Sequence, residues 1–409
     1  MIPKNIIFYF PSNTGAHGVN ILFLSLANYF ANNTEYNIFI GDFENGYMVT
    51  QNKNPKVREL YIIKNQVIDI PHDSIVIIQT VAPWHIENEL NFHNDTKILF
   101  WNLNPYNLLH YFRDYRSNIP SLIKLGAAYP QFLMKMFVTI LVEKNGIIFA
   151  MAEERRSAET VLDKKLEIPF YVPVFSDDPR KKTFKFNHQF AWLGRLADFK
   201  VSILTHTIEK LSEYSKKKKY KIVFYVIGDG PDKSDIEYKA SLCENEYFEV
   251  VFKGVVEHTQ VEQFLTKTVC VLFAMGTSAL EGGRLGLPTI LLDFSYYPIG
   301  GDYKFKYLFE TEEYSTGDEV GTLEYKGGYH SLDSIIDELR DENKYEKVGT
   351  LCYQYYQEHH DIKFVFKRLI DAIDRCDLRY EAIKSLRHNP IMKMFKAARK
   401  WMRDLKSTN

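Results

Sequence analysis

The amino-acid sequence predicts an α/β protein built from two doubly wound domains. The first observation is the opening of the chain, where the apolar run 5–10 leads through a glycine-containing loop, 11–20, into the helical pattern 21–30. The second is that apolar segments of strand length continue to alternate with helical segments in both halves of the chain. The third is a break in this rhythm at 168–187, where prolines and a charge cluster are typical of a linker.

Both halves of the chain alternate strands with helices. In the first half we expect strands at 5–10, 37–41, 60–63, 74–79, 97–101 and 146–150, and helices at 21–30, 121–143 and 152–162. In the second half we expect strands at 189–193, 221–227, 249–252, 269–273 and 289–292, with the charge run 216–219 as a solvated loop. No Gly-x-Gly-x-x-Gly fingerprint follows the first strand, which argues against a nicotinamide-dependent oxidoreductase.

The last part of the chain changes to helical patterns, at 331–356 and 361–383. We therefore divide the chain into an N-terminal Rossmann-like domain at 1–172, a second Rossmann-like domain at 187–360 and C-terminal helices at 361–409. We expect these C-terminal helices to pack back on the first domain.

The composition describes a folded, soluble protein, since 45% of its 409 residues are hydrophobic and 25% are charged. A net charge of −1 gives no general attraction for nucleic acid, so no nucleic-acid partner is expected. The four cysteines are far apart, which favours a reducing, cytoplasmic setting over a disulfide framework or a zinc site. We find no signal peptide before the first strand, and no apolar run reaches the ~18–20 residues of a membrane span.

A basic amphipathic helix is predicted at 389–406, with Asn389 as its N-cap and Pro390 as its first residue. Apolar residues recur on one face: Ile391, Met394, Phe395, Ala398, Met402 and Leu405. The positions around them are mostly basic: Lys393, Lys396, Arg399, Lys400, Arg403 and Lys406. We expect this helix to contact an anionic membrane surface, which would make the protein peripheral on the inner face of the cell membrane. The alternative is a helix docked on the protein with a solvated basic face.

The segment 275–290 lies between two apolar runs and has the pattern of a turn, a short helix and a strand. We expect Thr277 or Ser278 to cap the helix and Gly286 to end it. Two glycines inside the helix cost about 1 kcal/mol each relative to alanine, which a chain tolerates where a ligand approaches the backbone. Amides at the helix start would bind a phosphate, and Glu281 would accept hydrogen bonds from ribose hydroxyls. An ordinary crossover with glycines for packing is the alternative.

Three other strand ends in the second half carry residues suited to a nucleotide. Arg195 and Lys200 follow Gly194, and two cations at the carboxyl end of a parallel strand suit a diphosphate. Gly228 begins a tight turn after the next strand, and Gly254 follows the strand after that. Taken alone, each feature is equally explained by ordinary turns and solvated charges.

Together these segments resemble the nucleotide-binding half of GT-B glycosyltransferases, particularly glycosyltransferase family four. The resemblance covers about residues 188–293 well and the N-terminal half only in general layout. It implies two Rossmann-like domains facing a central cleft, and transfer of a sugar from a UDP-sugar to a glycan or lipid-linked acceptor in bacterial surface polysaccharide synthesis. It also implies a retaining hexosyltransferase that needs no metal or other cofactor, and no Asp-x-Asp metal-binding pair occurs in the sequence.

Carried over residue by residue, the resemblance assigns the donor diphosphate to Arg195 and Lys200, as catalytic residues. Backbone amides at a helix start would assist them: Gly276, Thr277 and Ser278. Glu281 would accept hydrogen bonds from the ribose. The turns beside the nucleotide carry Gly194, Gly228, Gly254 and Val255, the last two flanking the base.

The first domain would contribute a glycine loop and candidate bases. Gly15 and Gly18 would lie near the diphosphate and the acceptor. His17 in this loop and His85 after a strand end are the candidate catalytic bases, although a lone histidine is more often structural. The chain departs from the family at Phe273, where a further glutamate near the transferred sugar is usual. This departure keeps two alternatives open, a non-catalytic sugar-nucleotide-binding module and a GT-B nucleotide-sugar epimerase.

Overall fold

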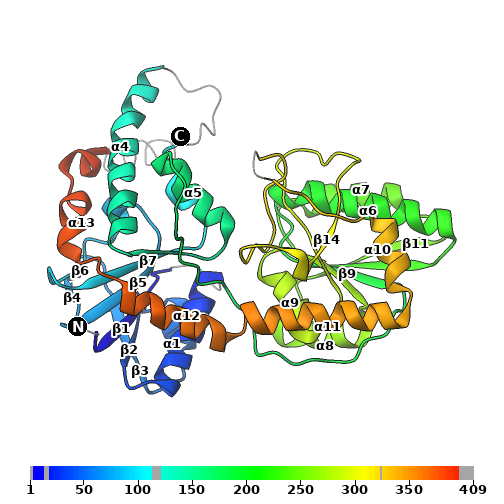
Figure 1. The fold of residues 1–409 in the computed structure, drawn as a ribbon, viewed down its shortest axis with the longest axis horizontal. Helices are drawn as coiled ribbons and strands as arrows, with labels where there is room; N and C mark the ends of the chain where they lie inside the picture. The colour runs from blue at the N-terminus through cyan, green and yellow to red at the C-terminus, as the bar shows by residue number, and fades with distance from the viewer. Residues whose placement is uncertain (1–2, 13–17, 113–120, 323–324, 396–409) are drawn as a thin grey trace. The chain divides into compact units, whose positions relative to one another are not determined.

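The computed structural model describes residues 3–12, 18–112, 121–322 and 325–395 (Figure 1). The chain folds into two compact units, one formed by 1–172 together with 366–409 and the other by 173–365. Each unit contains its own six-stranded sheet. After Val365 the chain therefore returns to the first unit.

The first unit is built on a parallel sheet with the strand order β3-β2-β1-β5-β7-β8. Its strands are β1 (Asn5–Tyr9), β2 (Asn37–Phe43), β3 (Val57–Ile62), β5 (Ser74–Gln79), β7 (Lys97–Asn102) and β8 (Ile147–Phe149). Its helices include α1 (Gly18–Asn33), α2 (Tyr47–Gln51), α3 (Tyr106–Leu109), α4 (Ser121–Glu143) and α5 (Ala152–Leu162). Smaller elements are the 3-10 turn η1 (Pro83–His85) and the short strands β4 (Ile68–Asp69) and β6 (Leu90–Asn91).

The apolar strand β1 lies inside this sheet because its side chains must be covered on both faces. Phe8 packs against Phe23 and Phe30 of α1, with ring centroids 5.8 and 5.7 Å apart. From β7, Phe100 packs on Phe137 of α4 at 5.1 Å. Figure 1 shows α1 and α4 on opposite sides of the sheet. The predicted α/β layering of this half is confirmed.

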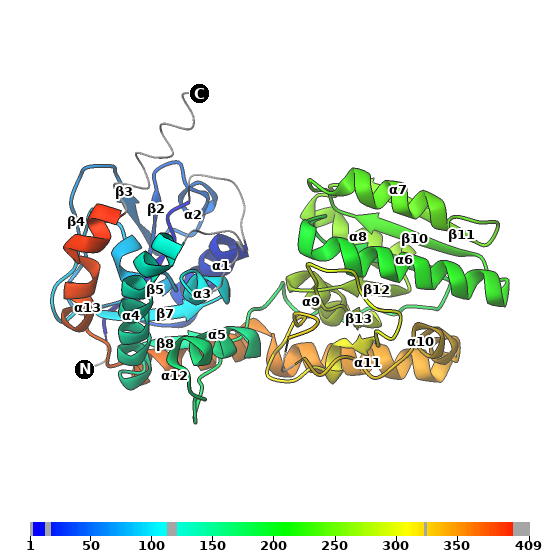
Figure 2. The same cartoon turned by 90° about the horizontal axis from the view of Figure 1, so that it is seen from above.

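The second unit repeats the design with the strand order β11-β10-β9-β12-β13-β14. Its strands are β9 (Gln189–Leu193), β10 (Ile222–Ile227), β11 (Phe248–Gly254), β12 (Val271–Ala274), β13 (Thr289–Leu291) and the antiparallel β14 (Lys306–Tyr307). Its helices are α6 (Asp198–Lys218), α7 (Lys233–Cys243), α8 (His258–Thr268), α9 (Thr277–Leu285), α10 (Leu332–Leu339) and α11 (Glu342–His359). Helices α6 and α7 cover one face of the sheet, and α9 and α11 cover the other (Figures 1 and 2).

The charged run 216–219, predicted as a loop, is part of a helix. Helix α6 continues through Lys218 and ends at Lys219, which has a left-handed conformation. The prediction was wrong because lysine is a good helix former and positive side chains are favoured at a helix C-terminus. Lys218 is also paired with Asp337, at 2.7 Å.

The single helix predicted at 361–383 is two helices, α12 (Ile362–Arg375) and α13 (Tyr380–Arg387). Between them the backbone pairs with β7, where the amide N–H of Ile98 donates to the Leu378 carbonyl at 3.0 Å. The prediction was wrong because this pairing is made with a segment distant in sequence, which no local pattern reveals.

The predicted start of the C-terminal helix is confirmed. Asn389 Oδ1 accepts the amide N–H of Met392 at 3.1 Å, and residues 390–395 are helical. The remainder of the predicted amphipathic helix, 396–406, lies outside the described residues. Within the described ranges, no helix combines the length and the apolar composition needed to cross a membrane.

Candidate functional site

Four parallel strands of the second unit end at one edge of its sheet. The register places Leu193, at the end of β9, beside Ile227 of β10 and Ala274 of β12. The predicted glycines at or just after these strand ends are Gly194, Gly228, Gly254 and Gly276. The amide of Gly194 donates to the carbonyl of Ile227 at 3.0 Å. The amide of Gly228 donates to the carbonyl of Gly254 at 2.8 Å, so these separate sequence segments meet at one edge.

Two of these positions require glycine for different reasons. A β-carbon on Gly228 would lie 2.1 Å from the carbonyl oxygen of Gly194, so only glycine lets the two turns approach this closely. Gly276 has φ of 64° and open space where a β-carbon would lie. It is the N-cap of α9, so the prediction that Thr277 or Ser278 caps this helix was wrong. The chain needs a positive φ to turn from β12 into the helix, and glycine adopts it without strain.

The start of α9 presents free backbone donors. In the part of the chain that is described, the amide N–H groups of Thr277 and Ser278 have no protein acceptor, and Thr277 is exposed. The first amides of a helix carry partial positive charge, reinforced by the helix dipole. This position therefore favours an anion.

Two cations lie beside the end of β9. Lys200 is in the first turn of α6, with its Nζ 5.8 and 5.5 Å from the ring centroids of Trp192 and Phe199. Burial and the positive charge of Arg195 lower the pKa of Lys200 to about 8. Neither cation forms an ion pair with any residue that the structure describes. Two unneutralised cations at the same sheet edge as free helix amides are suited to a diphosphate.

Glu281, the predicted ribose-binding residue, lies further along α9 and is only 7% exposed. Its Oε2 accepts a hydrogen bond from Arg284 Nε at 2.8 Å, and Arg284 Nη2 lies 2.8 Å from the same oxygen. Its Oε1 accepts a hydrogen bond from the hydroxyl of Ser176. Both oxygens of this carboxylate are therefore engaged within the second unit.

Two partners of Glu281, Arg284 and Ser176, were not predicted from the sequence. Arg284 follows Glu281 by three residues, a spacing that places both side chains on one helix face and could have predicted the pair. Ser176 is brought to α9 by the path of the chain before β9, and it carried no local signal.

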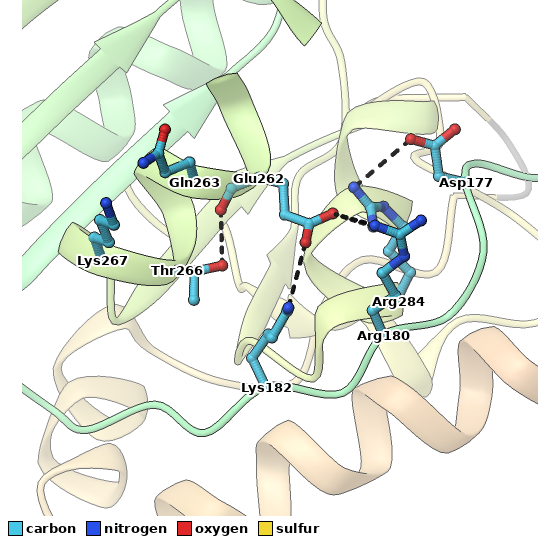
Figure 3. Close-up of a pocket in the computed structure, with 8 residues that line it drawn as sticks. All are labelled: Asp177, Arg180, Lys182, Glu262, Gln263, Thr266, Lys267 and Arg284. Atoms are coloured by element: carbon cyan, nitrogen blue, oxygen red, sulfur yellow. Dashed lines mark hydrogen bonds and ion pairs between the residues drawn. The ribbon is translucent and has the colours of Figure 1, made fainter. Parts of the chain in front are cut away.

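Arg284 also pairs with two other carboxylates, those of Glu262 and Asp177 (Figure 3). Its Nη1 lies 3.0 Å from Glu262 of α8, and its Nη2 lies 3.8 Å from Asp177. Burial tends to raise the pKa of Glu262, but the bonds and charges of Arg284 and Lys182 lower it overall. A cavity of about 450 Å³ adjoins these ion pairs, between α8, α9 and the segment before β9. None of the predicted site residues lines this cavity.

Val255 and Phe273 have opposite environments. Val255 follows β11 and is 79% exposed. Phe273 is fully buried in β12, where its ring lies 6.1 Å from that of Phe190 and 5.9 Å from that of Phe224. Phe273 is therefore a core residue.

The loop after β13 brings aromatic side chains near Lys200. The amide of Ser295 donates to the carbonyl of Phe199 at 3.0 Å, which fixes this loop against the first turn of α6. The hydroxyl of Ser295 then bonds both the carbonyl and the amide of Tyr297, at 2.8 and 3.0 Å. Tyr297 itself is 76% exposed. This loop, which is hydrogen-bonded to the first turn of α6, thus carries an exposed tyrosine.

In the first unit, two of the predicted residues are described. Gly18 is the first residue of α1, and a β-carbon there would meet no other atom within 4 Å. His85 ends η1, after β5; it is exposed, and its Nε2 lies 3.1 Å from the hydroxyl of Tyr111. Gly15 and His17 lie outside the described residues. Among the residues that the structure covers, no group of three or more His, Cys, Asp or Glu side chains is arranged to hold a metal ion.

No family model and no curated protein matches the chain, whereas solved structures do. A glycosyltransferase from Rickettsia africae ESF-5 is similar at 10% identity and a TM-score of 0.56, over 91% of this chain and 98% of that chain. WaaG, a glycosyltransferase involved in lipopolysaccharide biosynthesis, is similar at 10% identity and a TM-score of 0.51, over 90% of this chain and 99% of WaaG. The chain has the GT-B fold.

The predicted GT-B fold, with two Rossmann-like units, is thereby confirmed. At such low identity the similarity establishes the GT-B fold alone, because proteins that share a fold can act on different substrates. The chain also matches TarM of S. aureus at 14% identity and a TM-score of 0.47, over 74% of this chain and 55% of TarM. Membership in family four stays a prediction.

Proposed function

We propose that this protein is a glycosyltransferase that moves a sugar from a UDP-sugar to a glycan or lipid-linked acceptor. The observation that carries the proposal is that Arg195 and Lys200 share one sheet edge with the free amides of Thr277 and Ser278. A nucleotide sugar reacts when negative charge on the departing diphosphate is stabilised, and cations with helix amides provide this. The GT-B fold shared with WaaG supports the same class of reaction.

In the proposed reaction, the bond between the anomeric carbon and the diphosphate oxygen breaks, and its electron pair stays on UDP. The acceptor hydroxyl oxygen bonds to the anomeric carbon, and its proton passes to the candidate base, His85. Arg195 and Lys200 would bind the phosphate oxygens, and partial burial of Lys200 strengthens its interaction with that charge. We propose transfer without a metal ion, because these groups already supply positive charge. Retention of the anomeric configuration follows from the resemblance to family four.

For the nucleoside we propose two contacts, one with the ribose and one with the base. Glu281 would accept hydrogen bonds from the ribose, and the backbone of Gly254 and Val255 would flank the base. The exposure of Val255 supports this role, because a base could reach it from solvent. For the transferred sugar we propose the loop that carries Tyr297, because Phe273 is confined to the core.

For the acceptor we propose the first unit. His85 is exposed after the carboxyl end of β5 and its ring is held by Tyr111, so it is the candidate base with structural support. His17, with Gly15 and Gly18, belongs to the same proposal on the strength of the resemblance.

We also propose that the acceptor belongs to a bacterial surface polysaccharide and that the protein binds the inner face of the cell membrane, in the cytoplasm. Apolar side chains are exposed on the C-terminal helix and on α4, among them Met394, Phe395 and Phe132. The side-chain Nδ2 of Asn389 donates to the hydroxyl of Tyr129 at 2.9 Å and joins these two helices. Exposed apolar side chains that are followed in the sequence by basic residues suit anionic lipid.

The proposal is tested by measuring sugar transfer. Nucleotide sugars are first screened for protection against thermal unfolding, because a bound ligand raises the melting temperature. With the donor found, we expect Arg195→Ala and Lys200→Ala each to lower turnover at least about 100-fold, as loss of a charge-stabilising donor does. Both variants should keep the wild-type melting temperature. Near-normal turnover in both contradicts the proposal.

The burial of Phe273 favours one alternative, an enzyme fold that binds sugar nucleotides without catalysis. Such a protein would bind UDP and neither transfer nor hydrolyse any donor. A nucleotide-sugar epimerase would instead change the sugar and release UDP with no acceptor present. Running the transfer assay with and without acceptor separates these two from a transferase.

A further inference from the structure

Arg284 has an environment that is unusual for an arginine in a short helix. It is 1% exposed, and its guanidinium lies among the carboxylates of Glu281, Glu262 and Asp177. Burial of a guanidinium is unfavourable unless pairing and hydrogen bonds offset its lost hydration, and here both are present. The three carboxylates come from α9, from α8 and from the segment before β9, so three parts of the unit fix the position of one side chain.

The contact between Arg284 and Glu281 constrains the direction of the glutamate. Arg284 places two nitrogens, Nε and Nη2, at 2.8 Å from a single oxygen, Oε2. Ser176 donates its hydroxyl to the other oxygen. A carboxylate held at both oxygens has little freedom to rotate.

A carboxylate with a fixed direction is suited to the recognition of two neighbouring hydroxyls. Binding groups that are already oriented lose little entropy when the ligand arrives. A glutamate of the same helix without these partners would be free to point into water. Lysine could replace the charge of Arg284 but not its planar fork of donors, so it would hold Glu281 less firmly.

We infer that Arg284 is a positioning residue for the nucleoside: together with Ser176, it orients Glu281 so that the glutamate recognises the ribose hydroxyls. The inference rests on the proposed function and adds the residues that determine selectivity for the ribose. Glu262 and Asp177 act one step further away, by holding Arg284.

The experiment compares UDP with 2′,3′-dideoxy-UDP, which lacks both ribose hydroxyls, by calorimetry on the full chain. For the wild type we expect UDP to bind at least about tenfold more tightly, because hydrogen bonds to a charged group are lost in the analogue. For Arg284→Lys we expect this ratio to fall to about threefold or less, because lysine cannot hold both positions on Glu281. Binding of inorganic pyrophosphate, which has no ribose, should be the same in both proteins.

Two further variants are measured, one as a control and one as a second test. Arg340→Lys makes the same substitution elsewhere in the second unit. The Arg340 guanidinium lies 4.1 Å from the ring centroid of Tyr220, a residue that precedes β10. This variant should leave the UDP-to-analogue affinity ratio unchanged. Glu262→Gln perturbs Arg284 from α8 without altering α9, and it should lower the ratio even if Arg284→Lys folds poorly.

The outcomes separate this inference from the proposed function. A wild type that prefers UDP, with the same preference in Arg284→Lys and Glu262→Gln, overturns the inference alone. A wild type that binds UDP and the dideoxy analogue equally removes the ribose role of Glu281 and overturns the inference as well. A wild type that binds no UDP contradicts the proposed donor, and the inference with it.

Discussion

The ammonium group of Lys200 lies against Gly194: a β-carbon on this glycine would be 3.3 Å from Lys200 Nζ. Gly194 also has φ of 154°, which a residue with a side chain adopts only with strain. The absence of a side chain at the end of β9 thus leaves room for the lysine. The position of the cation depends on the glycine before it.

We predict that Gly194→Ala displaces Lys200 and weakens UDP binding at least about tenfold, since one charge-assisted contact is lost. Calorimetry measures the affinity, and thermal unfolding measures the accompanying loss of stability. Gly301→Ala is the matched control, because a β-carbon there meets no other atom within 4 Å. An unchanged affinity for UDP in Gly194→Ala would show that Lys200 does not bind the nucleotide from this position.

The binding of UDP should depend on pH through Lys200. Burial and the neighbouring Arg195 lower the pKa of Lys200 to about 8, so in the free protein this side chain loses its charge as the pH rises through that value. UDP affinity should therefore fall between pH 7 and pH 9.5. Lys200→Arg stays charged over this range and should remove the inflection.

At each pH, the Kd of the wild type for UDP is divided by the Kd of Lys200→Arg. UDP itself titrates equally in both measurements, so its titration does not affect this ratio. We expect the ratio to change by about tenfold across the range, as expected for the loss of one charge at a phosphate site. A constant ratio means that Lys200 is not the titrating group.

Tyr297 should contribute to the transferred sugar and not to the nucleotide. It is exposed on a loop that the amide of Ser295 fixes to Phe199, next to Lys200. We predict that Tyr297→Ala raises the KM for the donor sugar nucleotide about fivefold or more while the Kd for UDP stays the same, because only the sugar loses a contact surface. Tyr238→Ala, at an exposed tyrosine of α7, is the control. If Tyr297→Ala weakened the binding of the donor and of UDP equally, Tyr297 would contact the nucleotide and not the transferred sugar.

A buried acid in the first unit should make stability depend on pH. Glu154 in α5 is 1% exposed, burial raises its pKa to about 8, and its Oε2 has no partner among the described residues. The folded state therefore keeps a proton that the unfolded state loses above its ordinary pKa of 4.5. The free energy of unfolding should fall by about 1 kcal/mol per pH unit from pH 5 to pH 8 through this group, and stay level above it.

Glu154→Gln stays neutral at every pH, so it should remove this part of the slope. Urea unfolding of the full chain at pH 5, 6, 7 and 8 measures how the free energy of unfolding depends on pH. Glu167→Gln is the control, because Glu167 is exposed. An identical slope in Glu154→Gln and the wild type would assign the pH dependence to other groups.

The sequence predicted those features that local chemistry determines. Strand-length apolar runs predicted β5 and β9 at their observed bounds, and the glycines after the strands marked the sheet edge where Lys200 lies. Long-range pairing was not predictable: the backbone at Leu378 joins β7 and divides one expected helix into two. Ser176 reaches Glu281 by the path of a segment with no regular structure, so its role could not be read locally. Phe273 was identified as a departure, but only the structure places it in the core.

The most direct test of this account is calorimetric titration of UDP into the full chain in the absence of added metal. Three proteins are compared: the wild type, the double variant Arg195→Ala with Lys200→Ala, and Lys210→Ala, whose lysine lies on the same helix α6 and pairs with Glu213 at 2.8 Å. We predict that the wild type and Lys210→Ala bind alike, and that the double variant binds at least about 100-fold more weakly, because two charge-assisted contacts are lost. Wild-type affinity in the double variant, or no binding of UDP by the wild type, would contradict the account.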